Sequence, residues 1–256
     1  KKSYNDPNVF GLDLSNSKHH QNLALKVQLE TEAVLLKLLS MLKENYPTEN
    51  LYLSGGVALN VVANERIKNG NIFKNVILNG SVEDNGTAIG AGLAASFELD
   101  SQRKSSSITD YYGVKYNNKD ILEAVKQFDF KYKVLSENES FKLAAEMIAH
   151  DNVLGWFQGV SEFGPRALGN RSILANPVSS RTKYMLDHLM KCRDRYRPYA
   201  PVVIEESASK YFDIDSSSPV MMRNVKVLDK RLVAITHFDG TTFTVPSGQG
   251  GKYYLT

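Results

Sequence analysis

The stretch Phe163-Gly-Pro-Arg-Ala-Leu-Gly-Asn-Arg-Ser-Ile-Leu-Ala175 and the segment Lys191-Cys-Arg-Asp-Arg-Tyr-Arg-Pro-Tyr-Ala-Pro201 carry most of the information in this chain. Residues 161–200 hold eight Lys/Arg and three Asp/Glu, whereas all 256 residues together have a net charge of only +3. Glycine tolerates unusual backbone angles and proline fixes its own. The glycines and the proline of the first stretch therefore predict a shaped loop around Arg166 and Arg171.

A loop that presents guanidinium groups favours an anion site. The planar fork of arginine matches phosphate and carboxylate oxygens. The alternative is an ordinary solvated basic surface, which contributes little to stability. Apolar residues alternate with the charges, among them Phe163, Leu168 and Ile173, and a solvated face would not need them. The pattern thus favours an anion site.

Length and composition predict a globular protein of two domains. With 42% hydrophobic and 23% charged residues, the chain has enough apolar residues to build a substantial core. Its single cysteine, Cys192, excludes an intramolecular disulfide, and we expect a reducing, cytoplasmic location without a membrane segment. The positive charge is local, which favours a small anionic ligand over a nucleic acid.

The first hundred residues predict alternating helices and strands. Apolar residues recur at three- and four-residue intervals along 21–46 and predict a long amphipathic helix that ends at Pro47. The following expected elements are a strand at 51–54, a helix at 57–68, a strand at 75–78 and a helix at 87–99. This order is typical of an α/β domain with a parallel sheet.

A change to Ser, Lys and Asn predicts a linker at residues 104–118, between a domain at 1–103 and a domain at 119–256. In the second part the pattern predicts both helices and strands. The expected helices are 120–128, 137–150, 181–190 and 206–212, and the expected strands are 131–135, 153–157, 202–204, 221–228 and 232–238.

Two further segments are candidates for ligand binding. Ser54-Gly-Gly-Val-Ala-Leu-Asn60 places two glycines between a strand and a helix, where free N–H groups can meet phosphate or ribose oxygens. A tight turn explains the pattern equally well. Glu83-Asp84-Asn85-Gly86 puts carboxylates where a metal or nucleotide could bind, although an acidic helix N-cap explains them too. His237-Phe-Asp239-Gly240 could supply an acid–base pair or simply form a β-turn.

Together the motifs resemble the O-carbamoyltransferases of the NodU/CmcH family. The segments that carry the resemblance are Leu53–Asn60, Glu83–Gly92, Glu162–Ala175 and Arg197–Pro201, in the family's order and at its rough spacing. The resemblance implies a partial ATPase-like (ASKHA) domain followed by a YrdC-like α/β domain with a twisted mixed sheet. The first two motifs also occur in the wider ATPase superfamily.

The resemblance also implies an activity. Carbamoyl phosphate and ATP would give carbamoyl adenylate and pyrophosphate with loss of inorganic phosphate, and the carbamoyl group would pass to a substrate hydroxyl. By the same resemblance Arg166, Lys191 and Arg197 look like ligands of carbamoyl phosphate and nucleotide phosphates, converging on one site. An anionic reaction of this kind needs fixed positive charge where phosphate charge develops.

The remaining site residues follow from the same comparison. Gly55, Gly56 and Asn60 look like nucleotide contacts, Arg171 is a further candidate for phosphate, and Asp84 looks like a metal ligand. The metal would be iron in a full-length parent, and Mg²⁺ could accompany ATP. A homodimer is left open.

The chain departs from the family pattern in ways that bear on activity. The family's His-x-x-x-His metal pair has no counterpart, and Phe243 stands where an arginine is expected after Thr236-His-Phe-Asp-Gly-Thr241. We therefore expect a C-terminal fragment or a shortened relative. Two alternatives remain, namely a protein of the tRNA threonylcarbamoylation type, which would need a basic RNA-binding surface, and a non-catalytic anion- or nucleotide-binding module.

Overall fold

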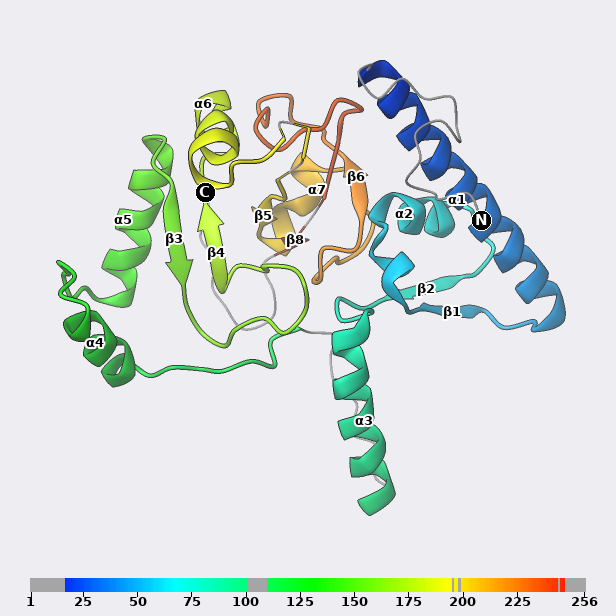
Figure 1. Ribbon diagram of the computed structural model, residues 1–256, viewed down its shortest axis with the longest axis horizontal. Coiled ribbons are helices and arrows are strands. Elements are labelled where there is room, and N and C mark those ends of the chain that lie inside the picture. The colour runs from blue at the N-terminus through cyan, green and yellow to red at the C-terminus, as the bar shows by residue number, and fades with distance from the viewer. Residues whose placement is uncertain (1–16, 101–109, 195, 198, 244, 247–256) are drawn as a thin grey trace, which may run out of the picture. The chain divides into compact units, whose positions relative to one another are not determined.

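The computed structural model describes residues 17–100, 110–194, 196–197, 199–243 and 245–246. It divides into two compact units, one made of Lys1–Tyr52 with Val62–Ile77 and the other of Leu53–Val61 with Leu78–Thr256. Helices and short strands occur together, which confirms the α/β class (Figure 1). The ASKHA and YrdC-like assignments and the domain boundaries predicted above remain predictions, and part of the expected linker lies outside the described residues.

The first unit is built around the long helix α1 (Ser17–Asn45), which confirms the amphipathic helix predicted from the sequence. Glu32 on its buried side accepts a hydrogen bond from Gln28 at 2.8 Å and pairs with Arg66 of α2 (Val61–Asn69) at 3.3 Å. Leu39 and Phe73 are buried in the same unit. The strands β1 (Asn50–Leu53) and β2 (Asn75–Leu78) pair in a two-stranded sheet, close to where both were predicted.

The helix predicted at 57–68 is divided in two. A short 3₁₀ helix, η2 (Gly56–Leu59), follows β1, and α2 begins only at Val61. Asn60 separates them because its ψ of 87° is not helical, although its N–H still bonds the carbonyl of Val57 at 3.0 Å. The prediction of one continuous helix was wrong at this point.

The second unit holds most of the remaining elements. Side-chain caps begin three of its helices, and Asn117 and Ser136 each form a complete capping box. The helical elements are α3 (Asp84–Leu99), α4 (Asn118–Gln127), α5 (Glu137–Ala149), α6 (Ser180–Met185), the π-helical η3 (Leu186–Met190), η4 (Glu205–Ser207) and α7 (Ala208–Tyr211). Helices α3, α4 and α5 confirm predicted helices, with α3 starting three residues earlier than expected.

Strands of the second unit pair two by two. β3 (Leu154–Phe157) and β4 (Arg171–Leu174) are antiparallel, as are β6 (Asn224–Lys226) and β7 (Thr241–Phe243), whereas β5 (Val202–Val203) and β8 (Val245–Pro246) are parallel. No sheet among the described residues has more than two strands, so the larger twisted mixed sheet that was expected does not occur there.

Two predicted strands were wrong, and three strands, β4, β7 and β8, were missed. Residues 131–135 are irregular, and Tyr132 and Val134 expose 51% and 77% of their surface, because no partner strand covers them. Residues 232–238 form turns in which the N–H of Ile235 bonds the carbonyl of Leu232 at 3.4 Å. Conversely, β4 lies inside the predicted basic loop, where it pairs with β3.

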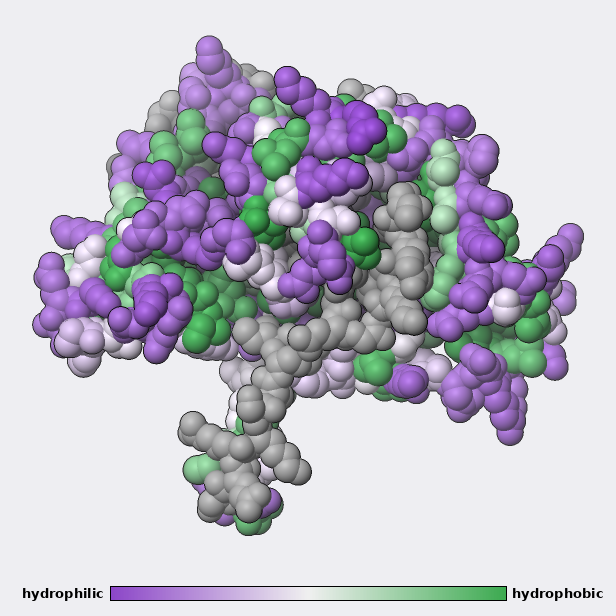
Figure 2. All heavy atoms as spheres, turned by 180° about the vertical axis from the view of Figure 1, so that it is seen from behind, coloured by the Kyte–Doolittle hydropathy of each residue, from purple (hydrophilic) through white to green (hydrophobic). Residues whose placement is uncertain are grey.

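Buried residues of the second unit form two apolar clusters. One contains Phe212, Val225, Leu232 and Ile235, and the other, described below, lies under the candidate site. Polar and apolar side chains are interspersed over the face drawn in Figure 2. Within the described segments no helix is long and apolar enough to cross a membrane.

Candidate functional site

The structure brings the two glycine-containing motifs together at one apolar cluster of the second unit. Ala58 from the first motif and Val82 from the second are buried with Val220 and Met222. The N–H of Gly55 donates to the carbonyl of Val82 at 2.7 Å, so the two chain segments are also joined by a backbone hydrogen bond. Segments 54–60 and 80–86 are separated in the sequence but are packed together in the folded chain.

The arginine motif attaches to this structure through two hydrogen bonds. The side-chain amide of Asn85 donates to the carbonyl of Phe163 at 3.3 Å, and the N–H of Phe163 donates to the carbonyl of Asp110 at 2.7 Å. The Ser81 hydroxyl donates to Oδ1 of Asp110 at 2.9 Å. Asp110 therefore links the segment before α3 to the beginning of the arginine motif.

Asp110 is fully buried, and its second carboxylate oxygen, Oδ2, has no hydrogen-bond partner among the described residues. Burial raises the pKa of this carboxyl above its usual 3.8, although hydrogen bonds from the Ser81 side chain and backbone oppose the change. A buried carboxylate with one unpaired oxygen is costly, since desolvation is only partly compensated. Sequence inspection gave no signal for this residue.

Glycines make room for the Asp110 carboxylate. A Cβ atom at Gly80 would lie 1.7 Å from Oδ2, and one at Gly164 would lie 2.8 Å from it. Such distances do not occur between non-bonded atoms, so any side chain at Gly80 would have to displace the carboxylate. The glycine of the arginine motif at 164 is thus favoured by its close packing against Asp110.

Glu162 braces the arginine loop from inside. Its Oε1 accepts hydrogen bonds from the N–H groups of Leu168 at 2.7 Å, Asn170 at 2.8 Å and Arg171 at 3.3 Å. These three donors point to one carboxylate oxygen because Gly169, with φ +102°, turns the chain between them. Glu162 was part of the quoted motif, but its role could not be read from the sequence.

The two arginines of the loop have different environments. Arg171 packs its guanidinium 3.5 Å from the centre of the Phe157 ring and donates to the carbonyls of Gln158, Asn170, Val114 and Gly159 at 2.5–3.4 Å. Its donors are therefore used within the protein, which argues against Arg171 as a phosphate ligand.

Arg166 is partly buried, and its Nε is buried without a hydrogen-bond partner. Across the described ranges no hydrogen bond or ion pair reaches the Arg166 side chain. A buried guanidinium donor without an acceptor is unfavourable in the protein alone. Arg166 is therefore the arginine of this loop that is available to an added anion.

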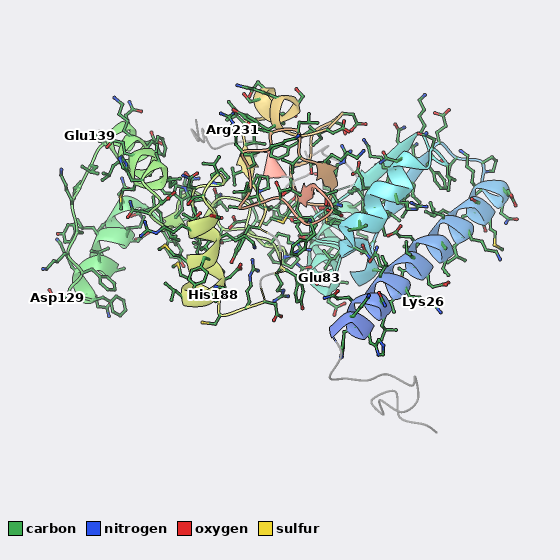
Figure 3. The ribbon with its side chains drawn as sticks, turned by 90° about the horizontal axis from the view of Figure 1, so that it is seen from above. Lys26, Glu83, Asp129, Glu139, His188 and Arg231 are labelled. Atoms are coloured by element: carbon green, nitrogen blue, oxygen red, sulfur yellow. The ribbon has the colours of Figure 1, made fainter. Side chains whose placement is uncertain are left out.

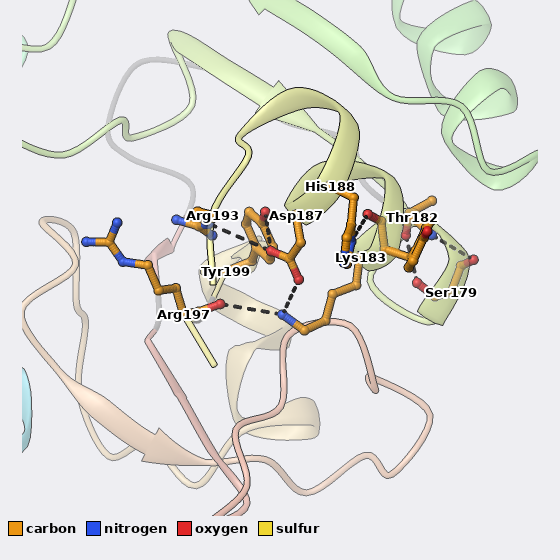
Figure 4. Close-up of polar contacts among 9 residues, drawn as sticks. Ser179, Thr182, Lys183, Asp187, His188, Arg193, Arg197 and Tyr199 are labelled. Carbon is orange, nitrogen blue, oxygen red and sulfur yellow. Dashed lines mark hydrogen bonds and ion pairs between the residues drawn. The ribbon is translucent and has the colours of Figure 1, made fainter. Parts of the chain in front are cut away.

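Lys191 and Arg197 are both exposed and lie beyond η3. The backbone carbonyl of Arg197 accepts a hydrogen bond from Lys183 at 3.4 Å. The guanidinium of Arg197 points away from Asp187 (Figure 4). In the part of the chain that the structure describes, no hydrogen bond or ion pair joins either side chain to Arg166. Convergence of the three cations on one anion remains a prediction.

A second group of charged residues surrounds Asp187 on η3. This carboxylate is buried and forms ion pairs with Lys183 at 3.2 Å and Arg193 at 3.7 Å (Figure 4). It also accepts a hydrogen bond from the hydroxyl of Tyr199 at 2.8 Å. Burial and the hydrogen bond to Asp187 raise the pKa of Tyr199 to about 12. On the same element lies His188 (Figure 3). Its ring stacks on that of Tyr184, with 4.1 Å between the ring centres. No motif in the sequence marks Asp187.

The glycine turn has the opposite character from the arginine loop. Gly55 has φ +98°, which disfavours any other residue, and neither Gly55 nor Gly56 would place a Cβ within 4 Å of another atom. Asn60 ends η2 with its backbone N–H bonded inside that helix. The space beside the two glycines is open, as a nucleotide contact requires.

Asp84 is the first residue of α3 and is exposed, while Glu83, the N-cap of this helix, makes no side-chain cap (Figure 3). No group of three His, Cys, Asp or Glu side chains that could hold a metal gathers within the described residues. One carboxylate is too few ligands for a tight transition-metal site. The described donors therefore do not fit the expected metal, and Asp84 remains a predicted ligand.

Two family models match this chain, and both describe the family that the sequence motifs resemble. The model described as "Carbamoyltransferase N-terminus" matches residues 8–93, and "Carbamoyltransferase C-terminus" matches residues 145–246. The chain belongs to the carbamoyltransferase family. The C-terminal match contains the arginine loop, the Asp187 cluster and most of the β strands of the second unit.

Named relatives agree with this family. Nodulation protein NolO of Bradyrhizobium diazoefficiens is 33% identical over 88% of this chain and 42% of its own length. The 3'-hydroxymethylcephem-O-carbamoyltransferase of Streptomyces clavuligerus is 31% identical over 75% of this chain and 35% of its own length. An uncharacterised protein of Synechocystis is 35% identical over 86% of this chain and 37% of its own length. The chain thus spans about two fifths of the relatives it matches.

Proposed function

We propose that this chain supplies the donor-activating part of an O-carbamoyltransferase. Carbamoyl phosphate would lose its phosphoryl group to water as inorganic phosphate, and the resulting carbamate oxygen would attack the α-phosphorus of ATP to give carbamoyl adenylate and pyrophosphate. The carbamoyl group would then pass to a hydroxyl of a small acceptor, with AMP as the leaving group. The relative from Streptomyces clavuligerus is named for O-carbamoyl transfer. Family membership supports carbamoyl transfer, and the intermediate and the acceptor class are our inference.

The observation that carries this proposal is the contrast between Arg166 and Arg171. Arg171 holds the loop together, whereas Arg166 has a buried Nε that finds no acceptor in the described part of the chain. A preorganised guanidinium donates to an anion without first breaking contacts of its own, which favours phosphate binding. We assign the phosphate of carbamoyl phosphate to Arg166, with Lys191 and Arg197 as further cations.

We assign the nucleotide to the glycine turn. Gly55 and Gly56 leave open space where a phosphate or ribose can approach the backbone. This turn is joined to the segment before α3 through Val82, and Asn85 in the first turn of α3 donates to the carbonyl of Phe163 in the arginine motif. The three motifs belong to one unit, which supports a shared substrate site.

The test is release of pyrophosphate from ATP by this chain, measured with and without carbamoyl phosphate. We expect release that depends on carbamoyl phosphate and is lost in Arg166→Ala. Release without carbamoyl phosphate, or equal release by the variant, would contradict the proposal. Binding of both substrates without release would instead identify a non-catalytic anion- or nucleotide-binding module.

A further inference from the structure

The loop His237–Thr241 is held rigidly, and it presents one histidine in a defined orientation. The N–H of His237 donates to the carbonyl of Thr241 at 2.9 Å, and the N–H of Gly240 donates to the carbonyl of His237 at 3.0 Å. Asp239 accepts the N–H of Thr241 at 3.0 Å, and Gly240 has φ +80°. Four residues thus fix the backbone on both sides of the imidazole.

Hydrogen bonding in this loop determines the imidazole tautomer. The Thr241 hydroxyl donates its single hydrogen to Oδ1 of Asp239 at 2.7 Å. The Thr241 hydroxyl oxygen, Oγ1, lies 3.2 Å from Nδ1 of His237. Because its hydrogen is directed to Asp239, Oγ1 can only accept a hydrogen bond from the imidazole ring. Nδ1 therefore carries the hydrogen, and Nε2 of a neutral ring carries a lone pair.

That lone pair is buried and has no hydrogen-bond partner. Burial lowers the pKa of His237, and Lys183 lowers it further, while Asp239 opposes the change. The ring also packs edge-on against Phe243 at 4.9 Å. The protein thus keeps the imidazole neutral with an acceptor that nothing in the described structure satisfies, which is unfavourable unless a ligand donates to it.

The surroundings indicate what such a ligand would be. The charge of Lys183 contributes to the lowered pKa of His237, and Lys183 itself lies 3.2 Å from Asp187 and donates to the carbonyl of Arg197. Through Lys183, His237 is linked to the backbone of Arg197, one of the two further cations that the proposed function assigns to carbamoyl phosphate. This molecule combines a phosphate with an amide NH₂, and the amide is a donor that matches a lone pair.

We propose that Nε2 of His237 accepts a hydrogen bond from the amide N–H of the carbamoyl group and so selects carbamoyl phosphate over acyl phosphates without an N–H. The inference rests on the proposed function, because it names the donor group that the same site recognises. His237 acts here as a specificity-determining binding residue, and no bond is made or broken. Acetyl phosphate, which has a methyl in place of the amide, is the matched probe.

The first experiment observes the ring itself by ¹⁵N NMR of imidazole nitrogens in the labelled chain. His237→Asn identifies the His237 signals among those of five histidines. We expect the Nδ1–H tautomer, and on addition of carbamoyl phosphate, but not acetyl phosphate, a shift of Nε2 towards a hydrogen-bonded value. An Nε2–H tautomer in the free protein would overturn the proposal.

The second experiment compares dissociation constants of carbamoyl and acetyl phosphate by calorimetry. We expect wild type to prefer carbamoyl phosphate about three- to tenfold, as one hydrogen bond allows. His237→Asn keeps a donor near Nδ1 but has no group at Nε2, so the preference should vanish. His237→Gln, whose amide reaches further, should retain part of it and controls for folding.

The outcomes separate this inference from the proposed function. A preference that survives in His237→Asn, or wild-type binding of both phosphates with equal affinity, overturns the inference and leaves the anion site in place. Wild type that binds neither phosphate refutes the proposed function and, with it, the assigned ligand.

Discussion

The arginine loop at 162–171 and the glycine turn at 54–60 are both rich in glycine, but they use it differently. In the loop and the segments around it, glycine allows close packing, since side chains at Gly80 or Gly164 would collide with Asp110. In the turn, Gly55 and Gly56 have open space around them. Glycine in a motif therefore signals a filled site in one region and an accessible site in the other.

The same contrast applies to the polar groups. The arginine loop satisfies most of its donors internally through Glu162 and Arg171, so that one guanidinium, Arg166, is left for a ligand. Rigid support of this kind is what an anion site needs, because a positioned donor loses little entropy on binding.

The largest effect is expected from Gly80→Ala, compared with the same change at Gly56. The new methyl at Gly80 would displace the buried Asp110 carboxylate, and we expect a loss of about 3 kcal/mol or more in the free energy of unfolding. Gly56→Ala should change it by less than about 0.5 kcal/mol. Urea denaturation followed by fluorescence of the single tryptophan, Trp156 on β3, measures both. Equal losses would remove the contrast.

Next in size is the loss of the Glu162 carboxylate. Glu162→Ala leaves the N–H groups of Leu168, Asn170 and Arg171 without their acceptor, and we expect a loss of about 2–3 kcal/mol in unfolding free energy. Glu162→Gln retains an oxygen acceptor without the charge and should lose about 1 kcal/mol. The same denaturation experiment applies. A Gln variant less stable than the Ala variant would show that Oε1 does not brace the loop.

A smaller, pH-dependent effect is expected from Asp110. Its raised pKa means that the folded state holds this proton more tightly than the unfolded chain does, which favours folding at low pH. That contribution is lost as pH rises from 3.8 through the folded pKa. The stability of wild type relative to Asp110→Asn should therefore fall as pH is raised through this interval. A relative stability that increases with pH would mean that the pKa is lowered instead.

Local signals made several elements predictable. The helices α1, α4 and α5 were predicted because their periodicity lies within a few turns, and the latter two begin with caps. The strand β4 was missed, and a false strand was assigned at 131–135, because pairing depends on a distant partner. An apolar run alone does not show whether that partner exists.

Local sequence signals also predicted part of the candidate site, but not the contacts between distant residues. Turn-forming residues and the local charge pointed to a loop around Arg166 and Arg171, and the family resemblance named Arg166 as a phosphate ligand. The different role of Arg171 depends on Phe157 and on carbonyls up to 57 residues away. Asp110 contacts Ser81 across 29 residues, and no motif marks it. These contacts exist only in the folded chain, so a single sequence could not reveal them.

The most direct test of the account is calorimetric titration of carbamoyl phosphate into wild type, Arg166→Ala and Arg181→Ala. Arg181 is an exposed arginine of α6 outside the loop and serves as the matched control. We expect Arg166→Ala to bind about ten- to a hundredfold more weakly, equivalent to about 1.5–3 kcal/mol, and Arg181→Ala to bind as wild type does. Wild-type affinity in Arg166→Ala, or an equal loss in both variants, would contradict the assignment of the anion to this loop.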